Sequence, residues 1–425
     1  MKIAIAGYGV EGEASYRYYA NDPSNDITIF EQNPAFVGPE GVKTVTGSDA
    51  FQQLVDFDLV LRSPSIPPQH IQTNGKVWSG TNEFFAKCTA DIIGVTGSKG
   101  KGTTASFIAA ILEAAGRKVW LVGNIGKPAL DILDQIQPED IVVYELSSFQ
   151  LWDIERSPKT AVILFIEQEH LDVHKDMAEY VAVKGNITRY QTPSDLLIYN
   201  AENEYSRGIA ELSVARKVGY PSGLTTHIQD GFFYNGEQKM CSIDAVQLPG
   251  AHNLSNAIAA IDATWLYTQD PEVIEAGLRA FRGLPHRLAF VRSVGGVKYY
   301  DDSIATTPTS AIAALRAFDG KKVIILGGSS KGSDFTELAE ELLHHDVRAV
   351  LIGAEAETLA KTADLAGFKD YEIITNPTME KIVTRATELA DNDAVVLLSP
   401  AAASFGLFEN YDDRGAQYIA AVEAL

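Results

Sequence analysis

Cysteine and long apolar runs are scarce in this sequence. Cys88 and Cys241 are its two cysteines, which leaves neither a disulfide framework nor a metal-binding cysteine spacing. No apolar run approaches the roughly 20 residues needed to cross a bilayer. The start of the chain, Met1-Lys-Ile-Ala-Ile-Ala-Gly7, is too short an apolar stretch for a secretory signal. These absences predict a cytoplasmic protein without membrane insertion.

Positive charge is also in short supply. The chain has 35 Lys and Arg residues against 56 Asp and Glu residues, for a net charge of −21. Nucleic acid is therefore not an expected partner, because no excess of cations exists to neutralise its phosphates. Small anionic substrates stay possible, since they need only a local pocket of donors. The 425 residues, 46% hydrophobic and 21% charged, are typical of a globular protein with two to four domains, and we expect a monomer.

Glycine and lysine gather in residues 94–104, Gly-Val-Thr-Gly-Ser-Lys-Gly-Lys-Gly-Thr-Thr. A strand pattern precedes them at residues 91–95, and a helix pattern follows at residues 105–115. Strand, Gly-rich loop and helix form a phosphate cradle, because loop N–H groups, the helix N-terminus and a lysine all attract phosphate. We therefore predict an ATP site. Its phosphate-binding residues are Gly97, Ser98, Lys99, Gly100, Lys101, Gly102, Thr103 and Thr104.

Within this loop, Lys101 is expected to reach the β- and γ-phosphates. The loop departs from the common G-x-x-x-x-G-K-[ST] pattern, because Val95 replaces the first Gly and Gly102 follows the Lys. Thr103, one residue later, is then the candidate hydroxyl for Mg²⁺. The alternative is a Gly-rich turn whose lysines are merely solvated.

The chain begins with a strand pattern at residues 2–6 and then Gly7-Tyr-Gly9-Val-Glu-Gly12, a match to G-x-G-x-x-G. Glu31 ends the next strand, as an acidic residue does in dinucleotide-binding units. Alone, this unit favours a nicotinamide cofactor with Glu31 on a ribose, but tight strand-to-helix packing also requires such glycines. A further strand at residues 58–61 leads into the proline-rich turn of residues 62–68.

The middle of the chain offers candidate metal ligands. Glu145 follows the strand pattern of residues 141–144, and a carboxylate there, beside a phosphate loop, is a candidate Mg²⁺ ligand or else a surface acid. His170 follows a strand at residues 161–166 and could bind metal, orient a carboxylate or be structural. Lys184 lies in a helical stretch and by itself indicates only a solvated helix lysine. Asn256, in the first turn of an alanine-rich helix, could cap it or read a base.

The last part of the chain alternates strands and helices. Strand patterns lie at residues 298–300, 322–326, 349–352 and 394–398, which predicts an open, mainly parallel sheet. Lys331 and Ser404 follow two of these strands, where such sheets bind ligands; the alternatives are a charged loop and a helix cap. The sequence thus predicts an α/β fold of three domains: a Rossmann-like N-terminal domain (residues 1–88), a central P-loop ATPase-type domain (89–284) and a C-terminal Rossmann-like domain (285–425).

Four motifs, in this order, resemble the Mur ligases. They are Gly123-Asn-Ile-Gly126, Glu145-Leu-Ser-Ser-Phe-Gln-Leu151, Gly283-Leu-Pro-His-Arg287 and Leu398-Ser-Pro-Ala-Ala-Ala-Ser404. The resemblance covers essentially the whole chain and implies an ATP-dependent, amide-forming ligase of cytoplasmic peptidoglycan precursor synthesis. It is strongest to the members that add D-glutamate to UDP-N-acetylmuramoyl-L-alanine through an acyl phosphate. Alternatives are another Mur ligase or a folylpolyglutamate-synthase-like ligase, an NAD(P)-dependent oxidoreductase, and a noncatalytic nucleotide-binding module.

The resemblance also implies roles for particular residues. The residues implied to bind the uridine nucleotide are Gly9, Val10, Glu11, Glu31 and Gln32. Those implied to contact the muramoyl-alanine part are Asn124, Ser147 and Gln150. Asn256 is implied for adenine, Arg287 and Asp302 for ATP, and Lys331, Ser404 and Tyr411 for D-glutamate. Two Mg²⁺ sites would use Thr103, Glu145, His170 and Lys184, the last as a carbamate, and the implied catalytic set is Lys101, Glu145, His170 and Lys184.

Some positions depart from the family pattern. The phosphate loop reads Lys99-Gly-Lys-Gly102 where Asn-Gly-Lys-Ser/Thr is usual, which is similar to folylpolyglutamate synthases. Ile304 replaces a Lys, Phe165 replaces an Asn, and Glu169 stands where Asp is common. Glu11 puts a negative charge near the expected diphosphate, where Thr or Ser is more usual.

Overall fold

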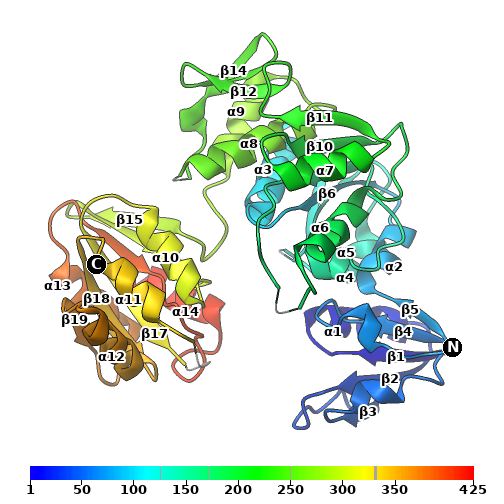
Figure 1. The fold of residues 1–425 in the computed structure, drawn as a ribbon, viewed down its shortest axis with the longest axis horizontal. Helices are drawn as coiled ribbons and strands as arrows, with labels where there is room; N and C mark the ends of the chain where they lie inside the picture. The colour runs from blue at the N-terminus through cyan, green and yellow to red at the C-terminus, as the bar shows by residue number, and fades with distance from the viewer. Residues whose placement is uncertain (125, 172, 249, 330–332) are drawn as a thin grey trace. The chain divides into compact units, whose positions relative to one another are not determined.

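The computed structural model describes residues 1–425 except 125, 172, 249 and 330–332. The chain divides into two compact units. The first contains residues 1–247 and 251–281, and the second contains residues 248–250 and 282–425. The two parallel sheets expected for the first and central domains therefore share one unit, whereas the expected C-terminal domain forms the other (Figure 1).

The first sheet confirms the Rossmann-like βαβ start. Its strands are β1 (Lys2–Ala6), β2 (Asp26–Glu31), β3 (Lys43–Thr46), β4 (Leu59–Arg62) and β5 (Lys76–Trp78), all parallel, in the order β3-β2-β1-β4-β5. Helix α1 (Val10–Ala20) follows β1. A Cβ at Gly12 would lie 2.1 Å from the Gly7 carbonyl oxygen, so glycine is required where α1 approaches β1.

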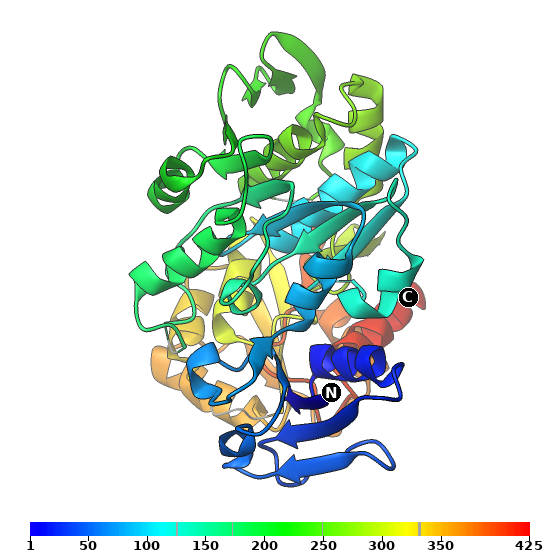
Figure 2. The ribbon, with the colours of Figure 1, turned by 90° about the vertical axis from the view of Figure 1, so that its right-hand side faces the viewer.

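The central sheet is also entirely parallel. Its strands are β6 (Asp91–Thr96), β7 (Val119–Gly123), β8 (Ile141–Glu145), β9 (Thr160–Ile163), β10 (Leu196–Asn200) and β11 (Arg216–Tyr220), in the order β11-β10-β9-β6-β8-β7. Its helices include α2 (Gly80–Lys87), α3 (Lys101–Ala114), α4 (Ala129–Ile132), α5 (Ser148–Leu151), α6 (Met177–Gly185) and α7 (Glu204–Leu212). Figures 1 and 2 both show the blue first sheet beside the cyan and green central sheet.

Helix α2 packs into the central core through its aromatic side chains. Phe84 and Phe85 are buried in the core of the central sheet, where both rings contact Tyr144 of β8. A domain boundary after residue 88 thus follows a helix that already packs in the central core. The expected boundaries themselves stay predictions.

The rest of the first unit includes a small antiparallel sheet and two helices that pack on α3. Strands β12 (Thr226–Gln229), β13 (Phe232–Asn235) and β14 (Gln238–Ser242) form a small antiparallel sheet, in a stretch whose polar sequence gave no clear pattern. Helices α8 (Ala251–Thr264) and α9 (Pro271–Ala280) pack on α3. This packing covers the helix that follows the phosphate loop.

The second unit is one six-stranded sheet with helices. Its strands are β15 (Ala289–Val294), β16 (Val297–Asp301), β17 (Lys322–Gly328), β18 (Val347–Gly353), β19 (Tyr371–Ile373) and β20 (Val395–Leu398), in the order β15-β16-β20-β17-β18-β19. Its helices are α10 (Pro308–Arg316), α11 (Thr336–Leu342), α12 (Ala356–Ala366), α13 (Met379–Leu389) and α14 (Tyr411–Glu423). All pairings are parallel except β15 with β16, which confirms the expected open, mainly parallel sheet.

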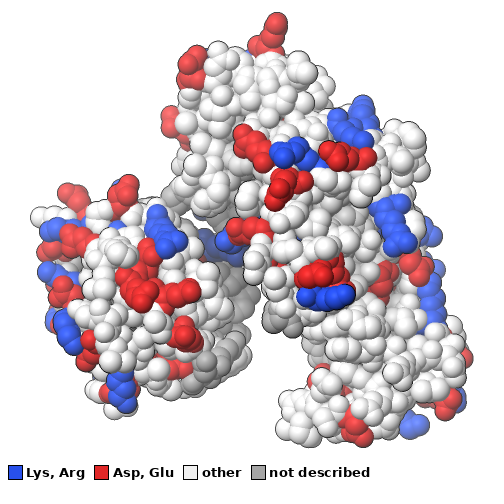
Figure 3. Space-filling model, in the orientation of Figure 1, with Lys and Arg blue, Asp and Glu red and all other residues white. Residues whose placement is uncertain are grey.

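Two general properties bear on function. Among the described residues, no helix combines the length and the apolar character needed to span a membrane. On the face drawn in Figure 3, Asp and Glu groups are interspersed with Lys and Arg groups.

Candidate active site

The phosphate loop lies between β6 and α3 and is built around two glycines with positive φ. A Cβ at Gly97 (φ +154°) would lie 2.7 Å from the Cβ of Leu164. A Cβ at Gly100 (φ +85°) would lie 2.3 Å from Oδ1 of Asn256, which is buried in α8. The loop therefore packs on neighbouring elements so closely that only glycine fits at these two positions.

Two lysines meet at one carbonyl of this loop. Nζ of Lys101, the first residue of α3, donates to the Gly97 carbonyl (3.1 Å) and to the Ser98 carbonyl (2.8 Å). Nζ of Lys184 in α6 donates to the same Gly97 carbonyl at 2.7 Å. Lys184 had no functional signal of its own in the sequence, because 87 residues separate it from Gly97. The fold thus brings two of the expected catalytic residues to the phosphate loop.

The surroundings of Lys184 disfavour its charged form. Its side chain is 1% exposed, and its Nζ lies 4.5 Å from the centre of the Tyr180 ring. Burial, followed by repulsion from Lys101, lowers the pKa of Lys184 well below its usual value. The loop therefore has two lysines beside it: Lys184, whose neutral form is favoured, and Lys101 at the start of α3.

Ser98 and Tyr180 form a polar network that the sequence did not predict. The Ser98 hydroxyl donates to the Glu167 carbonyl (2.9 Å) and lies 3.0 Å from the Tyr180 hydroxyl, which donates to Glu169 at 3.1 Å. Lys99 is exposed and forms an ion pair with Glu167. These contacts fasten the loop to the segment that follows β9. No sequence signal marks Tyr180, whose position depends on the packing of α6.

Glu145 ends β8 as expected and is 3% exposed. Nδ2 of Asn124, at the end of the neighbouring strand β7, lies 3.4 Å from Oε1 of Glu145. Thr103 is in the first turn of α3 and is also buried. Among the described residues, no group of three or more His, Cys, Asp and Glu could by itself hold a metal ion. Mg²⁺ needs fewer protein ligands, because it usually binds one or two carboxylates plus phosphate oxygens and water.

His170 lies in a left-handed turn, with φ +56°. Its side chain is 42% exposed, its Nε2 is 3.9 Å from Glu169, and its ring contacts those of Phe149 and Tyr180. It therefore lies beside the Tyr180 network. Its expected role at a metal stays a prediction.

The residues expected to bind the uridine nucleotide lie at the carboxyl end of the first sheet. Gly9 caps α1, and Val10 and Gln32 are exposed. Both carboxylate oxygens of Glu31 accept backbone N–H groups, from Tyr8 (2.9 Å) and Asn33 (3.2 Å). Glu31 thus shapes the glycine turn directly.

Ser147, Gln150 and Glu11 form a chain of hydrogen bonds. Ser147 and Gln150 form a capping box at the start of α5. Nε2 of Gln150 donates to Oε1 of Glu11 at 2.5 Å, across 139 residues of sequence. Burial, opposed by the Gln150 bond and by Arg62, raises the pKa of Glu11 to about 7. The expected diphosphate and muramoyl-alanine residues therefore contact each other.

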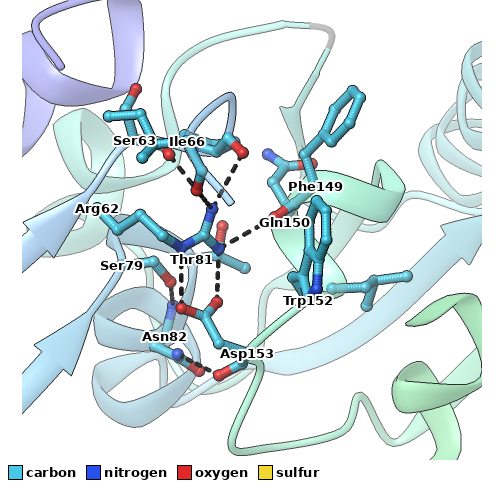
Figure 4. Close-up of polar contacts among 12 residues, drawn as sticks. Arg62, Ser63, Ile66, Ser79, Thr81, Asn82, Phe149, Gln150, Trp152 and Asp153 are labelled. Carbon is cyan, nitrogen blue, oxygen red and sulfur yellow. Dashed lines mark hydrogen bonds and ion pairs between the residues drawn. The ribbon is translucent and has the colours of Figure 1, made fainter. Parts of the chain in front are cut away.

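Arg62 of β4 is bonded to Phe149 in α5 and to Asp153 beyond that helix, as Figure 4 shows. Its fully buried guanidinium donates to both carboxylate oxygens of Asp153, at 2.6 and 2.9 Å. It also donates to four carbonyls, those of Ser63, Pro64, Ile66 and Phe149. The turn after β4 and helix α5 are thereby held by one side chain. Sequence reasoning placed Arg62 in a proline-rich turn, whereas it is the last residue of β4.

In the second unit, Asp302 is buried and Arg287 is exposed. Asp302 accepts the Ser399 hydroxyl (2.7 Å) and the Leu288 N–H (3.1 Å), and burial raises its pKa to about 7. Nearby, Nδ1 of His286 lies 2.6 Å from Asp301. The Gly283–Arg287 motif and the residue after it are thus bound to the end of β16, through the carboxylates of Asp301 and Asp302.

The residues expected at D-glutamate have different surroundings. Ser404 is 3% exposed, and Tyr411 is 38% exposed and begins α14. Lys331 lies outside the described residues. Arg414, which the sequence did not mark, is fully buried; it donates to the Ser303 hydroxyl (2.9 Å) and to the Ser303 and Ala402 carbonyls. Burial lowers the pKa of Arg414 to about 10.

Comparison with known proteins agrees with these motifs. Residues 95–264 match the model of the Mur ligase middle domain, and residues 286–402 match that of the Mur ligase glutamate ligase domain. The UDP-N-acetylmuramoylalanine--D-glutamate ligase of Clostridium tetani is 33% identical over 98% of this chain and 95% of the relative. The chain belongs to the Mur ligase family. The enzyme of the same name from Symbiobacterium thermophilum is 35% identical over 100% of this Mur ligase and 98% of the relative.

Solved structures give the same fold. The UDP-N-acetylmuramate-alanine ligase of Thermotoga maritima matches with a TM-score of 0.63, at 18% identity, over 100% of this chain and 99% of that one. The folylpolyglutamate synthase of Mycobacterium tuberculosis, complexed with ADP, matches with a TM-score of 0.60, at 18% identity, over 80% and 93%. The α/β architecture expected from the sequence is confirmed, and the protein is a Mur-type ligase, not an oxidoreductase.

Proposed function

We propose that this Mur ligase uses ATP to join D-glutamate to UDP-N-acetylmuramoyl-L-alanine in the cytoplasm, through an acyl phosphate. The main support is full-length similarity, at 33–35% identity, to relatives named for this activity. The glycine-requiring phosphate loop, with Lys101 at the start of α3, supports ATP as the phosphoryl donor.

The chemistry explains why such a loop is needed. A carboxylate cannot acylate an amine until one of its oxygens becomes a good leaving group, which phosphorylation provides. In phosphoryl transfer the protein mainly positions the reactants and neutralises charge. Loop N–H groups and Lys101 would hold the β- and γ-phosphates, with Lys101 exchanging its bonds to the Gly97 and Ser98 carbonyls for phosphate oxygens. Asn256, packed on Gly100, would hold the loop beside the adenine.

Support for Mg²⁺ comes from the oxygen donors among the expected ligands. Glu145 offers a buried carboxylate, Thr103 a hydroxyl, and His170 a ring nitrogen. Lys184, with its lowered pKa, favours the neutral amine that can add CO₂, and the resulting carbamate would offer carboxylate-like oxygens. Bound Mg²⁺ neutralises charge on a phosphoryl group. These four residues are therefore our proposed ligands for two ions.

The remaining substrates are assigned by the positions of their candidate residues. The uridine nucleotide would lie at Gly9, Val10, Glu31 and Gln32, beside Glu11. Asn124, Ser147 and Gln150 would contact the muramoyl-alanine part. In the second unit, Arg287 and Asp302 would engage ATP, and Lys331, Ser404 and Tyr411 would bind D-glutamate, with cation and hydroxyl groups pairing with its carboxylates.

A product assay tests this function. Mass spectrometry should detect an amide product from UDP-N-acetylmuramoyl-L-alanine, ATP and Mg²⁺ with D-glutamate, within a panel of amino acids. Lys101→Ala should abolish turnover. Lys159→Ala is the matched control: it removes the same charge from an exposed side chain that is paired with Asp91 and has no proposed role at ATP, and it should cost much less. Near-normal product from Lys101→Ala would refute the role of Lys101.

A second candidate is a folylpolyglutamate-synthase-like ligase, which the Lys99-Gly-Lys-Gly102 sequence favours. The fold similarity to the synthase does not choose between the two, because it shows the fold alone. Comparable turnover with folate and L-glutamate in the same assay would support this candidate and contradict the first.

A further inference from the structure

Glu11 and Gln150 form a hydrogen bond whose direction is fixed by its surroundings. Oε1 of Gln150 accepts the Ser147 N–H (2.9 Å) and the Ser147 hydroxyl (3.0 Å). Because the Ser147 N–H can only donate, the oxygen of the Gln150 amide must face Ser147 and the NH₂ must face Glu11. Gln150 is 2% exposed, so this orientation is held by packing as well.

Helix α5, which carries Gln150, is held by further hydrogen bonds. The carbonyl of Phe149 in the same helix accepts from Arg62 at 3.1 Å. Arg62 in turn bonds Asp153 and the turn after β4 (Figure 4). Its guanidinium is thus occupied, and it acts on Glu11 as a nearby charge.

Glu11 is in the first turn of α1, directly after the glycine turn. A small cavity beside it is lined by Glu11, Ala14, Gly80, Leu130 and Tyr144, among others. The groups that face the carboxyl are Gln150, Arg62 and Tyr144. Burial outweighs Gln150 and Arg62, so the pKa of Glu11 is raised to about 7, close to neutral pH.

This position matters because the first turn of α1 is where a diphosphate would bind. An ionised carboxylate there repels a diphosphate, whereas a neutral carboxyl does not and can donate its O–H to a phosphate oxygen. We propose that Glu11 is a specificity-determining residue that couples binding of the UDP-linked substrate to uptake of one proton. In the complex, Glu11 is a neutral carboxyl held by Gln150, and its O–H takes the place of the hydroxyl that Thr or Ser would supply.

The proton balance is simple. The free protein with ionised Glu11 takes one proton from the buffer when the substrate binds, and no covalent bond changes. The diphosphate diester of a UDP-sugar does not titrate between pH 6 and pH 8, so the proton is received by the protein. The inference rests on the proposed function, because it requires the UDP-linked substrate to bind at the glycine turn.

Calorimetry measures this uptake directly. UDP-N-acetylmuramoyl-L-alanine is titrated into the full chain in two buffers of different ionisation enthalpy, at pH 6, 7 and 8. With a pKa of about 7, uptake should be about 0.5 proton per bound substrate at pH 7 and about 0.9 at pH 8. The dissociation constant should rise about tenfold from pH 6 to pH 8.

Three variants identify the group that takes the proton. Glu11→Gln and Glu11→Thr should bind substrate without proton uptake and with a flat pH dependence, and Thr should restore the hydroxyl. Glu13→Gln is the matched control, because Glu13 lies in the same first turn but is exposed and paired with Arg17. It should keep the wild-type uptake.

Two results would overturn the inference, and they differ. Substrate binding without uptake in the wild type, or uptake that persists in Glu11→Gln, would refute the role of Glu11 and leave the proposed function intact. Absence of binding by the wild type and all variants, with ATP still bound, would refute the proposed substrate itself and the coupling with it.

Discussion

Replacing Arg62 by Met should destabilise the first unit far more than removal of an exposed arginine. Arg62→Met keeps most of the aliphatic length but removes a guanidinium whose side chain is 0% exposed. Asp153 loses two charge-assisted bonds, and four carbonyls lose their donor. Breaking a buried ion pair from one side costs about 3–5 kcal/mol. Asp153 is 20% exposed and regains some water, so we expect about 3 kcal/mol.

Arg17→Met is the matched control. Arg17 of α1 also forms an ion pair with a distant element, Asp131 of α4 at 2.7 Å, but it is 45% exposed. Exposed pairs of this kind contribute about 0.2–1 kcal/mol. Urea denaturation of both variants, followed by fluorescence, gives the change in midpoint for the transition of this unit.

A double-mutant cycle with Asp153→Asn then isolates the pair. The two single variants should not add, because each removes the same interaction. If Arg62→Met lowered the midpoint no more than Arg17→Met, the buried guanidinium would not fasten β4 to α5 and Asp153, and the argument from Figure 4 would fail.

Three further predictions concern the phosphate loop, the second unit and Lys184. Gly100→Ala should abolish ATP binding, measured by calorimetry, because its Cβ would collide with Asn256. The control is Gly116→Ala, which has a similar φ (+75°) but no atom within 4 Å of its Cβ, and it should leave ATP binding intact. Equal losses of ATP binding in the two variants would contradict the packing argument. Asp302 has a raised pKa of about 7, so the folded state binds its proton more tightly than the unfolded state; its contribution to stability is complete below about pH 4 and is lost as pH rises to about 7. Asp302→Asn should therefore flatten the thermal midpoint of the second unit between pH 4 and pH 7, and an unchanged slope would exclude Asp302 as its source. Lys184→Gln should abolish turnover. Wild-type protein incubated with ¹³C-bicarbonate should show a carbamate signal by NMR, and absence of that signal would show that Lys184 is not carbamylated.

The sequence predicted the parts of the fold that repeat local patterns. Strand β6 and the phosphate loop were predicted nearly to the residue, since apolar strand and glycine loop are contiguous. Helix α3 was expected from residue 105 but begins at Lys101, because the loop glycines hide its first turn from helical periodicity. Short strands were expected within residues 201–246 but could not be placed individually, because they are polar and partly exposed.

Contacts between distant residues were outside the reach of pattern reasoning. Lys184 meets the Gly97 carbonyl, and Gln150 meets Glu11, only because α6 and α5 pack beside particular loops. The same holds for Arg62, whose partner Asp153 is 91 residues away. Composition and spacing identify residue types, whereas these roles depend on tertiary packing.

An oxygen-transfer experiment tests the proposed reaction most directly. UDP-N-acetylmuramoyl-L-alanine labelled with ¹⁸O in its carboxylate is incubated with the protein, ATP, Mg²⁺ and D-glutamate, and the released phosphate is analysed by mass spectrometry. An acyl phosphate intermediate predicts that one labelled oxygen appears in each inorganic phosphate formed with amide product. Amide product with unlabelled phosphate would contradict the account.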